Sequence, residues 1–290
     1  MKILLLLAGL LALPAHAAVS AIDDAGHSVT LARPAQRVIS LAPHATELIY
    51  AAGGGARMVG AVSYSDYPPA ALKLPRIGDN RQLDLERIIA LKPDLLVVWL
   101  HGNAERQLAQ LKKLGIPLFY SEPKKLADIP GSLTRLGHLL GSEAAASTAA
   151  TRYQQRLDAL GRRYGKQKPV KVFYQVWHKP LYTLNNSHIA SDAIRLCGGI
   201  NVFGQLPLTA PTVNVEAVLA ANPDVIVAGS DDRRSTELEM WKRYPTLNAA
   251  RHQQLYTLDS SLLSRSGPRI LDGATLLCEK LDQARQAKQP

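Results

Sequence analysis

The sequence predicts an α/β fold: two Rossmann-like lobes related by internal duplication, joined by one long α-helix, with a ligand cleft between the lobes. The first observation is a repeat, because residues 84–99 are echoed by residues 214–229 at a constant offset of 130 residues. In each copy apolar residues recur at helical spacing, and an unbroken apolar run follows, as in a parallel strand covered on both faces. Pro93 and Pro223 separate the two parts, since the residue before a proline is disfavoured in a helix. The second observation is a stretch without Gly or Pro, residues 143–160, which predicts the connecting helix.

The composition is that of an ordinary globular protein. Its 290 residues suffice for two domains, and with 47% hydrophobic and 20% charged residues the chain is not of the disordered class. A formal net charge of +10 raises the question of nucleic-acid binding. However, the Lys and Arg residues are scattered and form no stripe interleaved with aromatic residues, so we expect no nucleic-acid partner.

The chain is predicted to divide into four segments. Residues 1–17 have the pattern of a secretory signal peptide: a positive charge at Lys2, an apolar core too short to span a bilayer, and an A-x-A motif ending at Ala17. We therefore expect export, with cleavage near Ala17. The expected segments are a signal peptide at 1–17, an N-terminal lobe at 18–141, a connecting helix at 142–166 and a C-terminal lobe at 167–290.

The N-terminal lobe is predicted to alternate strands and helices after a first segment with a turn at 24–27. Thr46 and Asn103 are each expected to cap a helix, because their side chains can accept a hydrogen bond from a free N–H of the first turn. Gly53 and Gly141 are expected to end helices. The predicted elements are strand 37–41, helix 47–52, strand 58–62, the first repeat with strand 95–98, helix 104–114, strand 115–120 and helix 129–140.

The C-terminal lobe is predicted to repeat this order after the connecting helix. That helix is expected to start with Ser142 as its cap and to run to Tyr164, and roughly 20 residues of helix span about 30 Å. Residues 201–204 match 57–60, the start of a strand in the first lobe. The predicted elements are strand 170–176, helix 191–196, the match at 201–204, the second repeat with strand 225–228, helix 238–244, strand 255–258, loop 259–268 and helix 269–287.

The chain contains two cysteines, Cys197 and Cys278. In the oxidising compartment that export implies, an even pair favours a disulfide, here within the C-terminal lobe. The alternative is a pair of buried free thiols.

The loops that follow the strands are the candidate binding site, because ligands of open α/β sheets bind beyond the carboxyl ends of the strands. Three histidines in such loops would suffice for a transition metal or a haem iron, and unrelated surface histidines are the alternative. Aromatic side chains there offer flat contact area to a ligand. The histidines are His44, His101, His178 and His188, and the aromatic residues are Tyr64, Tyr67, Trp99, Trp177 and Tyr182. The chain has no H-E-x-x-H spacing, phosphate loop, G-x-S-x-G or C-x-x-C motif, so we expect no enzyme, no bound metal and no cofactor.

Glu86 and Glu216 hold the same position in the two copies of the repeat. As first-turn acids they would each favour their helix by about 0.3–1 kcal/mol, which requires no partner. Alternatively, they form one anionic point on each lobe, where two arginines of another protein would dock.

Seven segments spread over both lobes match a known family. They are 37–43 with Thr46-Glu47-Leu48, 63–69, 85–88, 92–95, Trp99 with 102–107, 197–199 and 268–270. On these segments the whole chain after Ala17 resembles the class III (cluster A, helical-backbone) periplasmic substrate-binding proteins of ABC importers. The segments at 64–69 and 102–107 are narrower in distribution, and they resemble the cobalamin-binding members.

The resemblance implies a monomeric carrier in the periplasm that takes cobalamin, or a related corrinoid, to an inner-membrane ABC permease with its ATPase. It implies that Glu86 and Glu216 pair with permease arginines and that Cys197 and Cys278 form the family disulfide. Tyr64 matches a tyrosine that contacts the corrin, Trp99 a cleft tryptophan, and Arg265 an arginine of a binding loop. The full expected ligand-binding set is Pro43, His44, Tyr64, Trp99, Trp177, Ser261, Leu262, Leu263, Ser264 and Arg265.

The chain also departs from the family pattern. The family has tryptophans where this chain carries Asn80, Ala210 and Leu262, and an aspartate at Ser261. Trp177 and His44 are the candidates to compensate. The nearest alternative is therefore the same fold and role with haem or a ferric siderophore as the cargo. The alternative from another class is an exported metal-dependent hydrolase that uses cleft histidines and the pair Asp231 and Asp232.

Overall fold

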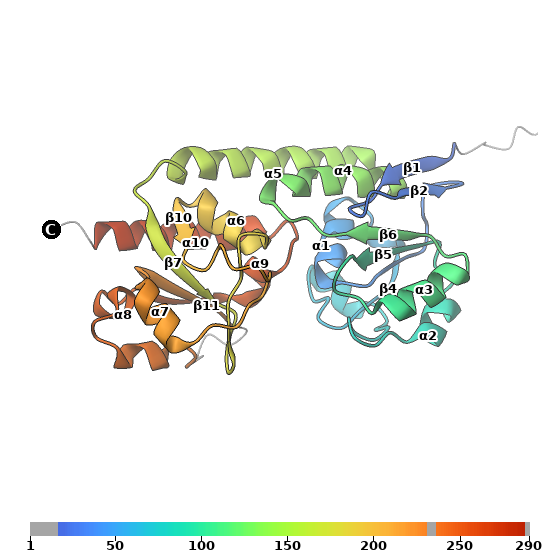
Figure 1. Ribbon diagram of the computed structural model, residues 1–290. Coiled ribbons are helices and arrows are strands. Elements are labelled where there is room, and N and C mark those ends of the chain that lie inside the picture. The colour runs from blue at the N-terminus through green and yellow to red at the C-terminus, as the bar shows by residue number, and fades with distance from the viewer. Residues whose placement is uncertain (1–16, 231–235, 288–290) are drawn as a thin grey trace, which may run out of the picture.

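The computed structural model describes residues 17–230 and 236–287, and it has two α/β lobes beneath one long helix (Figure 1). The expected signal peptide lies outside the described residues up to residue 16, and so does the pair Asp231 and Asp232. Along the described ranges no helix is long and apolar enough to cross a membrane.

Each lobe is built on a four-stranded parallel sheet. The N-terminal sheet has the order β4-β3-β5-β6 and the C-terminal sheet the order β10-β7-β11-β12, so the chain visits equivalent strands in the same sequence in both lobes. This confirms the predicted duplication. The strands are β3 (Val38–Ser40), β4 (Met58–Ala61), β5 (Leu95–Trp99), β6 (Leu118–Ser121), β7 (Val170–Gln175), β10 (Gly199–Asn201), β11 (Val225–Ser230) and β12 (Leu255–Asp259).

Helices cover these sheets and bury a core of aliphatic side chains. The helices are α1 (Pro43–Ala51), α2 (Leu85–Ala90), α3 (Glu105–Lys113), α4 (Ile129–Leu140), α5 (Glu143–Tyr164), α6 (Ile189–Leu196), α7 (Val215–Ala221), α8 (Asn248–Arg251), α9 (Ser260–Ser264) and α10 (Ile270–Gln286). Short 3-10 turns lie at Gly55–Arg57, Pro69–Lys73, Leu126–Asp128 and Glu239–Arg243.

The repeated stretch has the same local structure in both lobes. Lys92 and Asn222, which precede the two prolines, have φ of 46° and 43°, so both helices end with a residue in the left-handed region, a common way for a helix to terminate. The prolines that follow cannot continue the helix. The aspartate after each proline then accepts a backbone N–H of the neighbouring strand. Asp94 accepts from Arg37 and Asp224 from Lys171, at 2.8 and 2.9 Å. The Pro-Asp pairs of the repeat therefore serve the fold.

The connecting helix α5 runs along both lobes (Figure 1) and has 22 residues, as the Ala-rich stretch predicts. Its buried face follows the helical period through Ala146, Ala150, Tyr153 and Leu157. Ser142 precedes the helix, but its hydroxyl donates to the carbonyl of Ala52 at 2.6 Å, so the predicted side-chain cap is wrong.

Several other local predictions are corrected. Residues before 37 form a hairpin of β1 (Val19–Ile22) and β2 (Ser28–Leu31), and a second hairpin joins β8 (Trp177–His178) to β9 (Leu181–Tyr182). The strand expected at 201–204 lies earlier, at β10, and a 3-10 turn replaces the helix expected at 238–244. Asn103 does not cap α3, because its side chain accepts from Trp99 N–H and donates to the Leu41 carbonyl.

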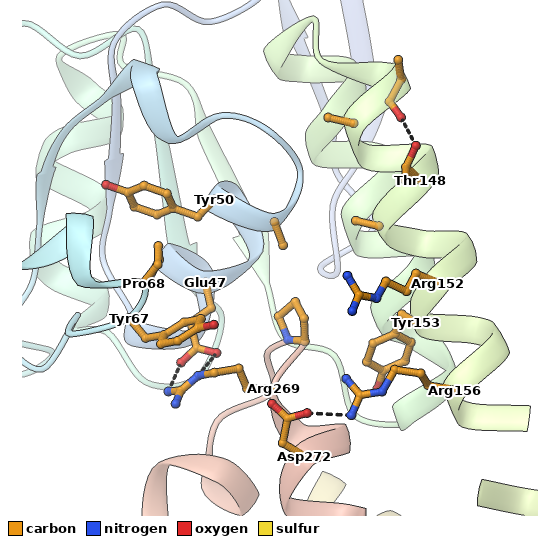
Figure 2. Close-up of a pocket in the computed structure, with 15 residues that line it drawn as sticks. Glu47, Tyr50, Tyr67, Pro68, Thr148, Arg152, Tyr153, Arg156, Arg269 and Asp272 are labelled. Atoms are coloured by element: carbon orange, nitrogen blue, oxygen red, sulfur yellow. Dashed lines mark hydrogen bonds and ion pairs between the residues drawn. The ribbon is translucent and has the colours of Figure 1, made fainter. Parts of the chain in front are cut away.

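The two lobes meet at a buried carboxylate. Glu47 of α1 is paired with Arg269, which immediately precedes α10, through a 2.7 Å contact between Oε1 and Nη2 and a 3.1 Å bond from Nε to Oε2 (Figure 2). Gly267 leaves room for it, since a Cβ there would lie 2.9 Å from the carboxylate. The Glu47 side chain is only 2% exposed, so this pair links the lobes in a place that water scarcely reaches.

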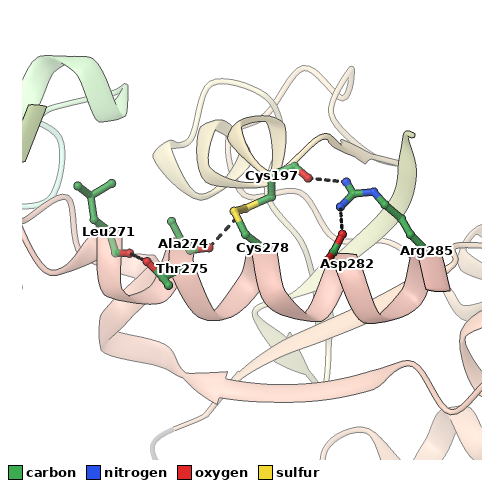
Figure 3. The surroundings of a disulfide bond; sticks show 7 residues. All are labelled: Cys197, Leu271, Ala274, Thr275, Cys278, Asp282 and Arg285. Atoms are coloured by element: carbon green, nitrogen blue, oxygen red, sulfur yellow. Dashed lines mark hydrogen bonds and ion pairs between the residues drawn. A yellow bond between two sulfur atoms is a disulfide. The ribbon is translucent and has the colours of Figure 1, made fainter. Parts of the chain in front are cut away.

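The disulfide between Cys197 and Cys278 is present, which confirms the prediction (Figure 3). It joins the end of α6 to the middle of α10, and both cysteines are fully buried. Arg285, about two helical turns after Cys278 on the same side of α10, donates to the carbonyl of Cys197 at 2.6 Å and to that of Lys168 at 2.7 Å. The cross-link and these hydrogen bonds fix α10 against the end of α6.

Candidate functional site

Tyr64 is the most exposed aromatic residue of the expected site, with 77% of its surface accessible. It stands in the loop after β4 with φ of 64°, a conformation that is uncommon for a residue other than glycine. Hydrogen bonds anchor this loop to the core. The hydroxyl of the fully buried Thr46 bonds to the hydroxyl of Ser40 at 2.9 Å and to that of Ser65, in the loop, at 3.0 Å. The fold thus presents the Tyr64 ring to solvent on a fixed support.

This network corrects the prediction for Thr46. The helix α1 begins at Pro43, not at residue 47, and its N-cap residue is Ala42. Thr46 is therefore an interior residue of the helix whose hydroxyl joins the end of β3, the helix and the Tyr64 loop.

Trp99 ends β5 and is half-buried against the core. Its ring lies on Gly102, where a Cβ would come within 1.9 Å of the indole, and edge-on to His44 at 5.7 Å between ring centroids. Both neighbours restrict the indole to one position. The half-buried Pro43 stands next to His44 at the start of α1.

His44 was expected in a cleft loop, but it lies buried in the first turn of α1. Its Nε2 is 3.2 Å from the carbonyl oxygen of Ser121, so this nitrogen carries the proton and donates it. Burial lowers the pKa of His44 from 6.5 to about 4. The side chain is thus a neutral support for Trp99, with Nε2 already used.

His44 supplies a prediction for the dependence of stability on pH. Because its pKa is lower in the fold than in the unfolded chain, its contribution is complete above pH 6.5 and is lost as the pH falls toward 4. From pH 7 to pH 5 we expect this group alone to reduce the free energy of unfolding by about 2 kcal/mol. The measurement is urea unfolding of the wild type and His44→Gln at both pH values. His188, whose pKa burial also lowers to about 4, is kept in both proteins. Equal pH dependence of the two proteins would rule out this role for His44.

The C-terminal part of the expected site is a short helix. Residues 259–268 were predicted as a loop, whereas Ser260–Ser264 form α9, capped by the Asp259 carboxylate that accepts from Ser261 N–H. Leu263 is 1% exposed and belongs to the core, and Leu262 packs its backbone against Gly273. The hydroxyl of Ser264 donates to the Ser260 carbonyl at 2.6 Å. Of this segment, Ser261, Leu262 and Arg265 are half-buried, and Ser264 is exposed.

Arg265 crosses from the C-terminal lobe to the N-terminal lobe. Its guanidinium donates to both carboxylate oxygens of Asp66 at 2.5 and 3.2 Å, and to Glu47 at 3.3 Å. The hydrogen bond from Arg265 lowers the pKa of Asp66. Asp66 lies two residues after Tyr64, so the arginine of one lobe is held beside the aromatic loop of the other.

Sequence reasoning missed Asp66 and Glu47 as partners of this arginine. The signal that was present is the lone carboxylate of α1, since Glu47 lies in a run of residues, His44 to Ile49, that are all buried. A buried carboxylate is nearly always paired, so a partner arginine was to be expected.

Trp177 is 53% exposed at the start of β8, and its indole N–H donates to the carbonyl of Lys179 at 3.0 Å. Its ring is tilted against that of His178 at 5.6 Å. At the positions where the family carries tryptophans, Asn80 and Ala210 are exposed, and the Asn80 amide donates to the Gly102 carbonyl at 3.4 Å. Trp177 is therefore the exposed tryptophan of the C-terminal lobe that could contact a ligand.

The remaining histidines of the candidate loops do not gather. His101 contacts Glu122, and His188 accepts from Ala190 N–H at the start of α6. Within residues 17–230 and 236–287, no group of three or more His, Cys, Asp or Glu side chains is placed to hold a metal ion.

Glu86 and Glu216 are both exposed, each at the second position of its helix. Asp84 and Asn214 cap the same helices by accepting from Arg87 N–H and Ala217 N–H. Neither glutamate forms an ion pair with another described residue, so their carboxylates are open to an outside partner.

Comparison with known proteins places this geometry in a family. Residues 38–262 match the family described as "Periplasmic binding protein". The chain is 38% identical over 254 residues to a vitamin B12-binding protein of Vibrio cholerae, covering 87% of this chain and 91% of the relative, and 40% identical over 250 residues to one of Pectobacterium carotovorum, covering 85% and 88%.

Solved structures agree with the sequence relatives. The vitamin B12-binding protein BtuF of Vibrio cholerae superposes with a TM-score of 0.81 at 38% identity, over 88% of this chain and 99% of that one. The heme-binding protein RhuT of Roseiflexus superposes with a TM-score of 0.75 at 26% identity, over 86% and 98%. The chain belongs to the family of periplasmic binding proteins.

Proposed function

We propose that this chain captures cobalamin, or a related corrinoid, in the periplasm and delivers it to an inner-membrane ABC importer without catalysing a reaction. The observation that carries the proposal is the similarity to vitamin B12-binding proteins, at 38% identity over 87% of the chain and with a TM-score of 0.81 to a solved member. We propose that the carrier acts as a monomer.

The side chains fit a large, flat ligand. Tyr64 on one lobe and Trp177 on the other offer exposed aromatic surface, and Trp99 is held rigidly by Gly102 and His44. Aromatic faces on fixed supports give large contact area at little entropic cost. Arg265 supplies the polar contact, after exchanging part of its bonding to Asp66 for the ligand. Ser261, Leu262 and Ser264 of α9 and Pro43 would shape the wall, whereas the buried Leu263 supports α9 from the core.

Haem is the cargo against which cobalamin must be tested, because heme-binding proteins are among the structural relatives at 26% identity. Haem iron takes an axial His or Tyr ligand. The Nε2 of His44 is bound to Ser121 and the residue is buried, which disfavours it as that ligand. The hydroxyl of Tyr64 remains as the candidate on the exposed surface.

The test is isothermal titration of the chain from residue 18 onward with cyanocobalamin and with haemin. We expect one-to-one cobalamin binding, weakened at least about tenfold in Trp99→Ala because an aromatic stacking surface is lost. Tyr244→Ala, which removes a half-buried aromatic residue outside the candidate loops and the proposed set, is the control. Heat with haemin alone, accompanied by a Soret band, would transfer the proposal to haem, and the changed positions Asn80, Ala210 and Leu262 would then mark the altered pocket.

Glu86 and Glu216 are proposed to dock the carrier on two arginines of the permease. In the double variant Glu86→Gln with Glu216→Gln, we expect ligand affinity to stay unchanged and binding to the permease to weaken by about tenfold or more, because two charge-assisted contacts are removed. The measurement is binding to the importer reconstituted in nanodiscs. Glu105→Gln is the matched control, since Glu105 is also an exposed first-turn acid. Equal weakening in the control would contradict specific docking.

A further inference from the structure

A pocket of about 820 Å³ lies between α1, α5 and the start of α10, and none of the residues of the expected cobalamin site lines it (Figure 2). Cavities of roughly 300–1,000 Å³ are the size that holds small organic ligands. The pocket draws its wall from both lobes and from the connecting helix. Its lining includes Glu47, Tyr50, Arg152, Arg156, Arg269 and Asp272.

Counting the described residues alone, the charges in this pocket leave one guanidinium without a partner. Arg269 is bound to Glu47, and Arg156 contacts Asp272 at 2.6 Å, so each of the two carboxylates already has a cation. Arg152 forms no ion pair or hydrogen bond with any other described residue. Figure 2 shows its side chain reaching from α5 toward α1, with Arg156 one helical turn away. The pocket therefore presents unbalanced positive charge.

Apart from Thr148, the rest of the lining is apolar or aromatic. The alanines of α5 leave space opposite Tyr50 and Pro68, and the ring of Tyr67 lies 4.1 Å from the Arg269 guanidinium carbon. Stacking and ion pairing hold Arg269 in place. Within the described part of the chain, the pocket wall therefore has two paired cations, Arg156 and Arg269, and one unpaired cation, Arg152. This combination suits a molecule with an apolar body and one negative group.

We propose that this pocket binds a small organic monoanion, whose carboxylate or sulfonate pairs with Arg152 and whose apolar body lies against Tyr50 and the alanines of α5. The pair Glu47–Arg269 stands between this pocket and Arg265, which belongs to the proposed cobalamin site. Because the wall comes from both lobes, an occupant connects them on the side of the long helix. The site is separate from that of the proposed cargo.

The test uses anilinonaphthalene sulfonate, a fluorescent aromatic monoanion, as the probe. We expect saturable one-to-one binding to the wild type, with affinity reduced about tenfold in Arg152→Ala, as loss of a charge-assisted contact predicts. Thr148→Trp is expected to abolish binding without changing the charge, because an indole at this exposed lining position fills the space. The matched control is Arg106→Ala, an exposed arginine on α3 remote from the pocket lining.

Four outcomes would overturn the proposal: no saturable binding to the wild type, equal loss in Arg106→Ala, binding that survives in both pocket variants, or complete displacement of the probe by cyanocobalamin. Thermal unfolding of each variant shows whether it is folded, and both substitutions are at exposed positions. Repeating the titration with excess cyanocobalamin separates this site from the proposed cargo site. Probe binding that persists there and still depends on Arg152 supports the pocket even if cobalamin itself gives no heat. Complete displacement by cyanocobalamin would assign the probe to the cargo site and refute the separate pocket.

Discussion

Replacing Glu47 with Gln is expected to lower the free energy of unfolding by about 3 kcal/mol, because it removes one partner of a buried ion-pair cluster. Glu47 is 2% exposed, and its carboxylate serves Arg265 and Arg269, which are themselves 15% and 17% exposed. The amide of Gln is close in shape but lacks the charge, so both guanidinium groups lose their attraction to it. The measurement is urea unfolding at pH 7, monitored by fluorescence and circular dichroism.

The control is Asp272→Asn, which breaks another pair between a carboxylate and an arginine. The Arg156 and Asp272 side chains are 43% and 47% exposed, so solvent screens their attraction and we expect a loss below about 1 kcal/mol. A similar loss in both variants would mean that the interlobe carboxylate contributes no more than a surface pair. The role assigned to Glu47 in joining the lobes would then fail.

The duplicated architecture could be predicted because its signals are local. The apolar periodicity that predicts a helix and the proline that ends it are both set by residues close together in sequence. The structure has the two helices of the repeat, and each ends before its proline as expected. Helices α4 and α5 were predicted at the residues where they occur, since neither was in competition with a strong strand pattern. The disulfide followed from two cysteines in an exported chain.

The hydrogen bonds and ion pairs of the site could not be predicted in the same way. Thr46 is a residue type that often caps a helix. Its hydroxyl instead bonds to that of Ser65, 19 residues away, and so connects α1 to the Tyr64 loop. Arg265 and Arg269 are 218 and 222 residues from Glu47, and no spacing rule connects them. The helix α9 has five residues, all Ser or Leu, and is fixed by its cap at Asp259 and by packing of Leu263 rather than by a periodic pattern.

Removing the disulfide is expected to cost about 4 kcal/mol in the free energy of unfolding, because the cross-link restricts the unfolded chain over a long loop. Cys197 and Cys278 are 81 residues apart in sequence, so the cross-link closes a long loop in the unfolded chain. Without it the unfolded chain gains a large conformational entropy. The variant is Cys197→Ala with Cys278→Ala, in which both replacements are small enough for the buried space. The measurement is urea unfolding of the whole protein, followed by circular dichroism and by tryptophan fluorescence, to which the fully buried Trp241 of the C-terminal lobe contributes.

The native contacts around the cross-link should survive in this variant. Arg285 bonds to the carbonyls of Cys197 and Lys168, and these backbone atoms are unchanged by substitution to alanine. A dithiol reductant supplies the control: it should destabilise the wild type by a similar amount and leave the double variant unaffected. If the wild type resists the reductant and the variant loses less than about 1 kcal/mol, chain entropy is not the source of the stability. The hydrogen bonds of Arg285 would then be sufficient to hold α10 against α6, and Arg285→Ala would be the variant with the large loss.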